Sequence, residues 1–223
     1  MTSVRIPIVQ KILSANDQMA AQNRQLFSDK GIFTINIMAS PGAGKTSVIL
    51  QTIKALSGKL RLAVIEGDTA PVTIDADKIS MAGVPAIQIN TGGDCHLDAA
   101  MVSDAMKAMQ LDDFDLVIIE NVGNLVCPAS FDLGQHANVL IASVPEGDDK
   151  PYKYPAIYRG LHALILNKTD LLPYIPFKAD YFFAGVDALN PDLAKFPMSC
   201  MSGEGVDAWV EWITAQVKKH QAG

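Results

Sequence analysis

The chain has 223 residues, of which 49% are apolar and 19% are charged, and its formal net charge is −6. A chain of this length and composition can bury one well-developed core, so we expect a single domain over residues 1–223. The mild negative charge argues against nucleic acid as the main partner, because phosphate backbones are bound by clustered Lys and Arg, and the sequence has no such cluster.

The sequence also lacks the signals of membrane insertion and of a disulfide scaffold. It contains no run of eighteen apolar residues, and its first thirty residues scatter polar groups where a signal peptide needs an apolar block. We therefore expect a cytoplasmic protein that does not enter a membrane. Its three cysteines, Cys95, Cys127 and Cys200, are an odd number and too few for a disulfide framework, so reduced thiols are expected.

The first predicted element is an amphipathic helix within an N-terminal helical segment, residues 1–30. Its apolar residues recur at spacings of four and seven, which suits one face of a helix that ends at Gly31. The residues of this predicted face are Ile8, Ile12, Met19 and Leu26.

Six short apolar runs follow, each bounded by Gly, Asp, Asn or Ser. Most of them lack the strict alternation of a half-exposed strand, which is typical of strands covered on both faces. We therefore expect an α/β fold, with a mostly parallel sheet flanked by helices on both faces. The predicted strands are residues 32–39, 61–66, 85–90, 115–120, 138–143 and 162–167. The last predicted helix packs one apolar face on this sheet, and that face consists of Val206, Trp209, Val210, Ile213 and Val217.

The first predicted strand runs directly into ASPGAGKTS, residues Ala39 to Ser47. Between a strand and a helix this pattern is typical of a phosphate-binding loop, because small residues let N–H groups point at phosphate oxygens and the helix dipole adds positive charge. Lys45 is predicted to reach the β- and γ-phosphates, and the Thr46 hydroxyl to bind Mg²⁺. Ala39 stands where the first glycine of the pattern usually is. The predicted phosphate-binding residues are Gly42, Ala43, Gly44, Lys45, Thr46 and Ser47.

Acidic residues follow two of the predicted strands, where Mg²⁺ needs carboxylates directly or through water. Glu66 and Asp68 leave one strand and Asp75 follows; the alternative for the two aspartates is that they cap helices. Glu120 and Gly123 in ENVG replace the DxxG of most GTPases, so that the carboxylate can hold water or metal while the glycine N–H senses the γ-phosphate. The predicted catalytic residues are Lys45, Asp68, Asp75 and Glu120, and the predicted Mg²⁺ ligands are Thr46, Asp68, Asp75 and Glu120.

No glutamine or arginine stands in an obvious position to organise the attacking water, so slow hydrolysis is expected.

The predicted strand 162–167 leads into NKTD, whose spacing resembles the NKxD guanine-recognition element of GTPases. The carboxylate of Asp170 can accept both the ring N–H and the exocyclic amine of guanine, and adenine offers no such pair on that edge. NKTD alone could be an ordinary loop, but after a strand and downstream of a phosphate loop it favours GTP. SCMSGEG, residues 199–205, resembles the fifth GTPase element. The predicted base-side residues are Asn167, Lys168, Asp170, Ser199, Cys200 and Met201.

Taken in order, these motifs resemble the HypB family of GTPases, within the SIMIBI class of P-loop proteins. The runs that carry the resemblance cover nearly the whole chain: MASPGAGKT, EGDTAPVTIDADKI, INTGGDCHLDA, ENVGNLVCP, PEGDDKPYKYP and NKTDLLP. The resemblance implies Mg²⁺-dependent GTP hydrolysis that assists nickel insertion into nickel-iron hydrogenase. It also implies a GTP-favoured homodimer with a metal site at or near the interface, a nickel-exchanging partner of the HypA type, and the hydrogenase large subunit as recipient.

The chain departs from the family at two places. Some members carry an N-terminal cysteine-rich or histidine-rich nickel segment, which these 223 residues do not contain. Some also carry a second histidine four residues after the first, where this chain has Ala100. We therefore expect a leaner metal site than those members have.

The metal ligands that we predict are Cys95, His96 and Cys127, which follow predicted strands on the nucleotide side of the sheet. Thiolate and imidazole suit Ni²⁺ or Zn²⁺, but three ligands do not close a four-coordinate site. Two chains together offer six such residues, three from each chain. They could hold two ions, with both Cys127 sulfurs bridging the ions, or they could hold one ion through a subset of the six. Cys127 lies four residues beyond Gly123, so a loop that shifts when the γ-phosphate is lost would move the Cys127 thiolate. We therefore hypothesise that GTP hydrolysis loosens the bound metal. The alternative is that the cysteines only pack, which is our interpretation of Cys200.

The loop PEGDDKPYKYP places Lys150 and Lys153 after the predicted strand 138–143. One of these lysines could reach the phosphates of a partner chain across a two-fold interface, and we include Lys153 among the predicted nucleotide-binding residues. The alternative is a solvated charged loop.

Three other functions stay open. A nickel-delivery GTPase of the urease type has similar motifs, although its metal motif places Cys, Pro and His together, which this sequence does not. A small-molecule kinase would use the phosphate loop but rarely needs NKTD. A regulatory module could bind GDP or GTP without turnover, and single-turnover phosphate release separates it from the enzyme.

Overall fold

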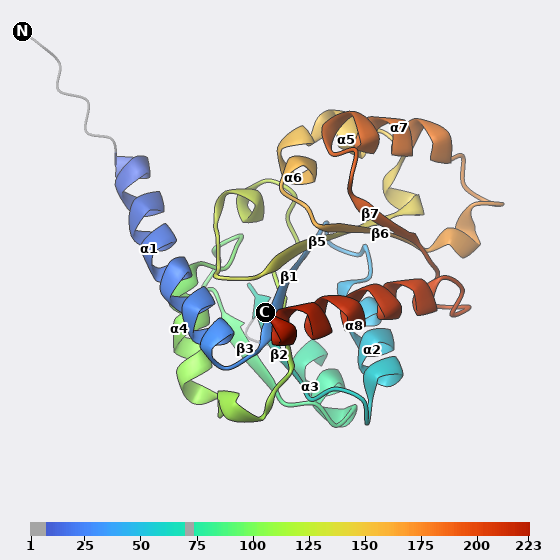
Figure 1. Cartoon of the computed structure of the whole chain (residues 1–223). Coiled ribbons are helices and arrows are strands. Elements are labelled where there is room, and N and C mark those ends of the chain that lie inside the picture. Colours follow the sequence, from blue (N-terminus) through green and yellow to red (C-terminus); the bar gives the residue numbers. More distant parts are fainter. Residues whose placement is uncertain (1–7, 70–73) are drawn as a thin grey trace, which may run out of the picture.

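The computed structural model describes residues 8–69 and 74–223, and Figure 1 traces the chain through them. Residues 1–7 of the predicted N-terminal segment and residues 70–73 of the EGDTAPVTIDADKI run lie outside the described residues. The strands are β1 (Phe33–Ala39), β2 (Leu62–Asp68), β3 (Ala86–Asn90), β4 (Leu116–Glu120), β5 (Ala137–Ser143), β6 (Ala163–Asn167) and β7 (Ala194–Pro197). The α-helices are α1 (Ile8–Asp29), α2 (Lys45–Leu56), α3 (Ile74–Met81), α4 (Ala99–Ala108), α5 (Lys150–Lys153), α6 (Pro155–Arg159), α7 (Ala179–Leu189) and α8 (Val206–Ala222). The 3₁₀ turns are η1 (Leu111–Asp113), η2 (Cys127–Ser130), η3 (Val144–Glu146) and η4 (Thr169–Leu171).

All seven strands belong to one sheet, in the order β3-β2-β4-β1-β5-β6-β7. Every neighbouring pair is parallel, which confirms the prediction of a mostly parallel sheet with helices on both faces. The six predicted strands are all present. The prediction missed β7, a four-residue edge strand whose apolar run is interrupted by Lys195 and ends at Pro197. An edge strand tolerates both residues because one side of it pairs with no other strand.

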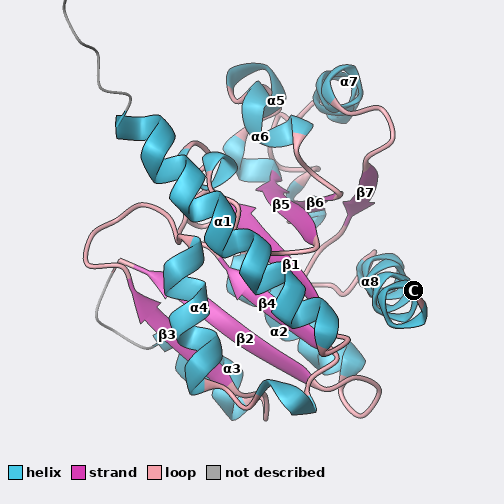
Figure 2. Cartoon of the chain, turned by 60° about the vertical axis from the view of Figure 1, so that its left-hand side comes forward, coloured by secondary structure: helices cyan, strands magenta, loops and turns pink. Residues whose placement is uncertain are grey.

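The helices form two layers, one on each face of the sheet (Figures 1 and 2). On the first face, α2, α3 and α8 enclose the largest apolar cluster with the inward side chains of the strands. On the second face, α1 and α4 cover one half of the sheet and α5, α6 and α7 cover the other. None of the helices in the described part of the chain is both long and apolar enough to cross a bilayer.

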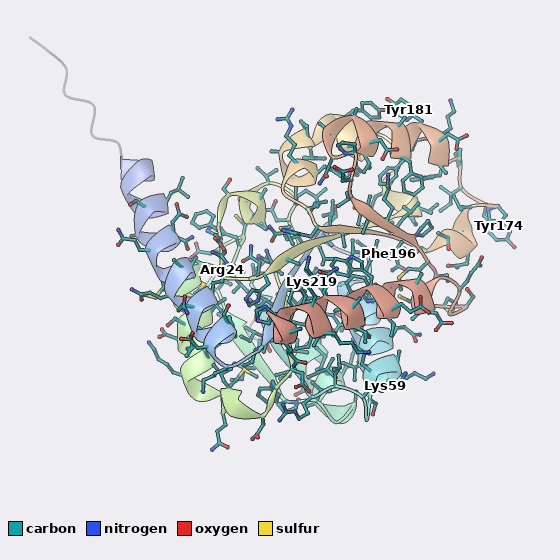
Figure 3. The ribbon with its side chains drawn as sticks, in the orientation of Figure 1. Arg24, Lys59, Tyr174, Tyr181, Phe196 and Lys219 are labelled. Carbon is teal, nitrogen blue, oxygen red and sulfur yellow. The ribbon has the colours of Figure 1, made fainter. Side chains whose placement is uncertain are left out.

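Helix α8 packs on the sheet through the face that the sequence predicts. Val206, Trp209, Ile213 and Val217 are buried, and Val210 packs at the margin of the same cluster. The Trp209 ring meets Phe196 of β7 edge-on, and Phe196 lies between the sheet and α8 in Figure 3.

Helix α1 has the predicted period but buries a different face, so the predicted apolar face is wrong. Ile12 is 55% exposed and Leu26 is 40% exposed. The side chain of Ile8 lies outside the described part of α1; among residues 12–29 the buried ones are Asn16, Ala20, Asn23 and Phe27, at spacings of four, three and four. A buried asparagine is tolerated when its amide is hydrogen bonded, and both asparagines have partners on other segments of the chain. The helix ends at Asp29, before Gly31, whose φ of +67° fits a residue that follows a helix.

Next to β5, His136 is held in its neutral form. Its ring stacks on Phe33 and lies 4.2 Å from the ring of His220, and its Nδ1 accepts a hydrogen bond from the Thr34 N–H at 3.0 Å. Burial, followed by the nearby His220 and Arg24, lowers the pKa of His136 to about 4. A protonated Nδ1 could not accept the bond from Thr34.

We therefore expect His136 to make the folded state less stable in acid. Between pH 6.5 and about 4 the unfolded chain binds a proton that the folded chain excludes, so the free energy of unfolding falls as the pH falls through that window. We expect His136 to contribute about 1–3 kcal/mol to this loss. The His136→Gln variant keeps an acceptor for Thr34 but does not titrate. Urea unfolding at pH 7 and pH 4.5 should show a smaller difference in the variant than in the native chain, and equal differences would contradict the assignment.

Candidate nucleotide and metal sites

The predicted phosphate loop connects β1 to α2 at the carboxyl edge of the sheet. Gly42 and Gly44 have φ values of +77° and +104°, a backbone region that favours glycine. A Cβ on Gly44 would lie 2.5 Å from the Nδ2 atom of Asn167, so glycine also fits here sterically. Ala39 is the last residue of β1 and does not have the positive φ that favours glycine, so alanine is accommodated at that position. Lys45 opens α2, where the helix dipole adds positive potential.

The NKTD segment lies directly against this loop. The Asn167 Nδ2 donates to the Ala43 carbonyl at 3.0 Å, and the Lys168 Nζ donates to the Gly42 carbonyl at 2.7 Å. The Asp170 carboxylate accepts a 2.5 Å hydrogen bond from the Ser199 hydroxyl. Segments more than a hundred residues apart in the sequence thus meet at one point.

A cleft of about 610 Å³ opens beside these residues. It brings together most of the predicted base-side set with the start of α2, and its lining includes Gly44, Ser47, Gln51, Asn167, Lys168, Asp170, Cys200 and Met201. Burial, followed by Asp170, raises the pKa of the Cys200 thiol to about 11, so this cysteine stays protonated at neutral pH. The Cys200 N–H donates to the Asn167 Oδ1 at 3.4 Å, and its side chain packs against the apolar cluster of the first face.

Two glutamates lie side by side below the phosphate loop. Glu66 of β2 and Glu120 of β4 are register partners, and each is 3% exposed. The Glu120 Oε1 accepts a hydrogen bond from the Thr46 hydroxyl at 3.2 Å. The Oε2 atoms of both glutamates are buried without a hydrogen-bond partner among the described residues. Burial is the main reason that the pKa of each is raised to about 7.

Buried carboxylate oxygens that lack a donor are suited to a bound cation. Carboxylates and a hydroxyl are also the oxygen ligands that Mg²⁺ uses beside nucleotide phosphates. The residues present therefore fit a magnesium site, with Thr46 and Glu120 as predicted. The predicted set omitted Glu66, because only the pairing of β2 with β4 brings it to Glu120.

The other predicted magnesium ligands lie nearby. Asp68 ends β2 and Asp75 lies in the first turn of α3, and both carboxylates raise the pKa of Glu66. Asp75 also forms an ion pair with Lys78 at 2.7 Å. A carboxylate in the first turn of a helix interacts favourably with the helix dipole, so the capping alternative for Asp75 stays open. The role of both aspartates as ligands stays a prediction.

Gly123 and Lys153 have different positions relative to the phosphate loop. A Cβ on Gly123 would lie 3.2 Å from the backbone of Pro41, so this predicted phosphate sensor packs directly on the loop. Lys153 does not line the cleft; on α5 its ammonium group forms an ion pair with Asp149 at 2.5 Å. A role for Lys153 in a partner chain stays a prediction.

Cys95, His96 and Cys127 form a compact cluster at the same edge of the sheet. One ligand atom from each lies within 4.8 Å of the others, and no other such group of three is found in the part of the chain that the structure describes. The two Sγ atoms are 2.8 Å apart, and the Cys95 Sγ lies 3.8 Å from the His96 Nδ1. The Cys127 thiol beside it raises the pKa of Cys95. The His96 ring lies against Phe131 at 3.9 Å between centroids. The structure thus brings the three predicted metal ligands together.

Helix α1 holds both segments that carry these ligands. The Asn16 Oδ1 accepts from the Ala99 N–H at 2.9 Å, while its Nδ2 donates to the Asp132 carbonyl at 2.8 Å. The Asn23 Nδ2 donates to the carbonyls of Ala99 and Leu133 at 2.8 and 3.0 Å. Each asparagine therefore joins the start of α4, just after His96, to the loop that follows Cys127.

A salt bridge and a glycine complete this contact with α1. Arg24 points from α1 toward the loop (Figure 3) and binds both oxygens of Asp132, at 2.6 and 2.7 Å. Gly134 has a φ of +93°, and a Cβ there would lie 2.5 Å from the Cβ of Asn23. The only sequence signal of this arrangement is a pair of asparagines seven residues apart in a predicted helix, which periodicity of apolar residues does not detect.

Comparison with known proteins agrees with this geometry. The family profile described as CobW/HypB/UreG, nucleotide-binding domain, matches residues 33–194. The chain is 49% identical over 211 residues to the hydrogenase maturation factor HypB of Azotobacter vinelandii, covering 94% of this chain and 69% of that protein. It is 36% identical over 219 residues to the hydrogenase/urease maturation factor HypB of Helicobacter pylori strain J99, covering 96% of this chain and 89% of that protein.

A solved structure shows the same fold. The crystal structure of HypB from Helicobacter pylori in complex with nickel superposes with a TM-score of 0.88 at 34% sequence identity, covering 93% of this chain and 97% of that chain.

Proposed function

Because the chain belongs to the CobW/HypB/UreG family of nucleotide-binding domains, and within it to the HypB hydrogenase maturation factors, we propose that it is a GTP-hydrolysing metallochaperone that assists nickel insertion into nickel-iron hydrogenase. The observation that carries the proposal is the position of two sites at one edge of one sheet. The phosphate loop meets the NKTD segment there, and the Cys95, His96 and Cys127 cluster follows the neighbouring strands.

In the proposed nucleotide site each residue has one role. Lys45 binds the β- and γ-phosphates, and Asp170 accepts the two donors of the guanine edge. Thr46 and Glu120 hold a Mg²⁺ ion, with Glu66 beside them, and the bound ion neutralises phosphate charge. Gly123 senses the γ-phosphate from its place against the loop. The raised pKa values of the two glutamates describe the chain without a cation; a bound cation favours their ionised forms.

In the proposed metal site the ion is cargo. Three ligands leave a four-coordinate site open, so we propose that a second copy of the chain supplies the remaining ligands in a homodimer that GTP favours. A partner of the HypA type would exchange nickel with this site, and the hydrogenase large subunit would receive it. Thiols that bind metal must stay reduced, which fits the cytoplasm.

GTP and metal should then strengthen each other's binding by the same factor if both favour one dimer.

Delivery to urease is the second candidate. The observation that favours it is the name of the Helicobacter pylori relative, a hydrogenase/urease maturation factor. A regulatory module that binds GTP without turnover is the other alternative.

The proposed function is tested by two measurements on purified protein. Single-turnover assays with GTP should release phosphate in a Mg²⁺-dependent reaction. Metal analysis after addition of Ni²⁺ or Zn²⁺, in GDP and in a non-hydrolysable GTP analogue, should find bound metal at a fixed ratio to chains, with mass measurement reading the dimer. Bound GTP without phosphate release would favour the regulatory module, and GTP hydrolysis without metal binding would contradict the metallochaperone.

Asp170→Asn should change the base that the site selects. The carboxylate accepts two donors from guanine, whereas an amide can donate to the extra oxygen of xanthine, so we expect weaker GTP binding and tighter binding of xanthosine triphosphate. Loss of a charged hydrogen bond should cost roughly 1.5–3 kcal/mol of binding free energy. Titration with both nucleotides measures this, and Asp187→Asn, on the surface of α7, is the control. Equal affinity of the native chain for ATP and GTP would contradict guanine recognition.

A further inference from the structure

Glu120, the last residue of β4, and Asn121, which follows it, face opposite sides of the sheet. Side chains alternate along a strand, so Glu120 points toward α2 and the phosphate loop while Asn121 points toward the layer of α1 and α4. Ile118 and Ile119 show the same alternation, because they belong to the clusters of the first and second face respectively. Glu120 carries the hydrogen bond to Thr46. Asn121 is fully buried on the other side.

The Asn121 amide holds the segment that carries the metal ligands. Its Oδ1 accepts from the Leu97 N–H at 3.1 Å, one residue after His96, and from the Val122 N–H at 2.9 Å. Its Nδ2 donates to the Asn36 Oδ1 of β1 at 3.1 Å. The amide is therefore engaged at both ends, and neither end lies in water. A buried amide with its hydrogen bonds made on three different segments has little freedom to rotate.

The side chain of Leu97 makes a second contact, with strand β2. Leu97 is fully buried, and its isobutyl group lies over Gly67, where a Cβ would come within 2.6 Å of it. Gly67 stands between Glu66 and Asp68 on β2. The backbone of Leu97 is thus held by Asn121, the neighbour of Glu120, and its side chain packs on Gly67, the neighbour of Glu66 and Asp68.

We propose that Asn121 and Leu97 are positioning residues that transmit the state of the nucleotide site to Cys95 and His96. The proposal rests on the proposed function. A change in occupancy of the Thr46 and Glu120 site that shifts the end of β4 moves Asn121 with it. Because the Leu97 N–H is bonded to that amide, the adjoining ligands move relative to Cys127. The step from Glu120 to Asn121 passes from one face of the sheet to the other, and the contact of Asn121 with Leu97 is separate from the chain path through residues 123–127.

The experiment measures the coupling factor, which is the ratio of Ni²⁺ dissociation constants in GDP and in a non-hydrolysable GTP analogue. Competition with a chromophoric chelator gives both constants for the full chain at one fixed protein concentration. Asn121→Ala removes the amide and Leu97→Ala removes the contact with Gly67. Each variant tests transmission through the Asn121–Leu97 contact, so the test still stands if one of them folds poorly. Asn190→Ala is the matched control: this amide at the end of α7 donates to the carbonyls of Tyr158 and Leu161, away from both sites.

We expect a coupling factor of at least about 5-fold in the native chain and in Asn190→Ala, since allosteric coupling typically spans 5–150-fold. In Asn121→Ala and Leu97→Ala the factor should fall toward 1, while each variant still binds GDP and Ni²⁺. The factor should also be the same when read in reverse, from nucleotide affinity with and without Ni²⁺.

Three outcomes are distinguished. A coupling factor of 1 in the native chain, or variants that keep the native coupling factor, would overturn the proposal that Asn121 and Leu97 transmit the nucleotide state. Variants whose Ni²⁺ affinity falls by the same factor in both nucleotide states, so that the native ratio is kept, also overturn it, because they show a structural role without transmission. A native chain that binds no Ni²⁺ contradicts the proposed function itself.

Discussion

Lys45→Ala should abolish tight binding of the triphosphate, and Thr46→Ala should leave some binding while removing the Mg²⁺ dependence of hydrolysis. The two effects differ because Lys45, at the start of α2, is the proposed phosphate ligand, whereas the Thr46 hydroxyl is bonded to Glu120 at 3.2 Å and is the proposed metal ligand. Removing a donor that stabilises developing phosphate charge typically costs 100–1,000-fold in rate. We expect a loss of at least about 100-fold in the turnover of each variant.

Titration with a fluorescent GTP analogue and phosphate release at varied Mg²⁺ separate the two phenotypes. Lys59→Ala is the matched control, because this lysine is exposed on the turn after α2 (Figure 3) and should behave as the native chain does. If Thr46→Ala hydrolyses GTP at the native rate with native Mg²⁺ dependence, the assignment of this loop is wrong.

Cys127→Ala should remove most of the metal affinity. The Cys127 Sγ lies 2.8 Å from the Cys95 Sγ, so its loss removes one of the two sulfur ligands that the cluster offers. Loss of an outer-shell partner of a metal ligand already costs about 10–100-fold in affinity, and loss of a ligand should cost more. Absorption from nickel–thiolate charge transfer and metal content after gel filtration measure the effect.

Proton release gives an independent check on the same site. The thiol proton must leave before the metal binds, so uptake should release protons and weaken as the pH falls. The neighbouring Cys127 raises the pKa of Cys95 above its ordinary value, so this thiol carries its proton at neutral pH and must release it when the metal binds.

The matched control is Cys200→Ala, since that thiol lies in the nucleotide cleft with a pKa raised to about 11. Full metal binding by Cys127→Ala would leave Cys127 and the nucleotide site as neighbours without a shared function.

Local patterns of the sequence were enough for much of the fold. The continuous apolar runs predicted six of the strands, because a strand covered by helices on both sides is apolar at most positions. Five of the six are buried almost throughout, whereas β3 is only partly buried because it lies at the edge of the sheet. The heptad-like face of the last helix, with Trp209 at its centre, was also predicted correctly. The same approach failed for α1, where Asn16 and Asn23 occupy the buried face. Their partners lie on segments that are distant in the sequence, and hydrophobicity gives no sign of a hydrogen-bonded amide.

For the candidate sites, the sequence by itself determined the kinds of chemistry. ASPGAGKTS, NKTD and the Cys95–His96 pair each bring their groups together within a few residues, so backbone geometry alone fixes their relation. Tertiary structure decided which groups meet across the sheet. The register of β2 with β4 sets Glu66 beside Glu120, and strand alternation turns Asn121 to the opposite face toward Leu97. Strand pairing and side-chain direction depend on the packing of the whole core, which no short stretch of sequence specifies.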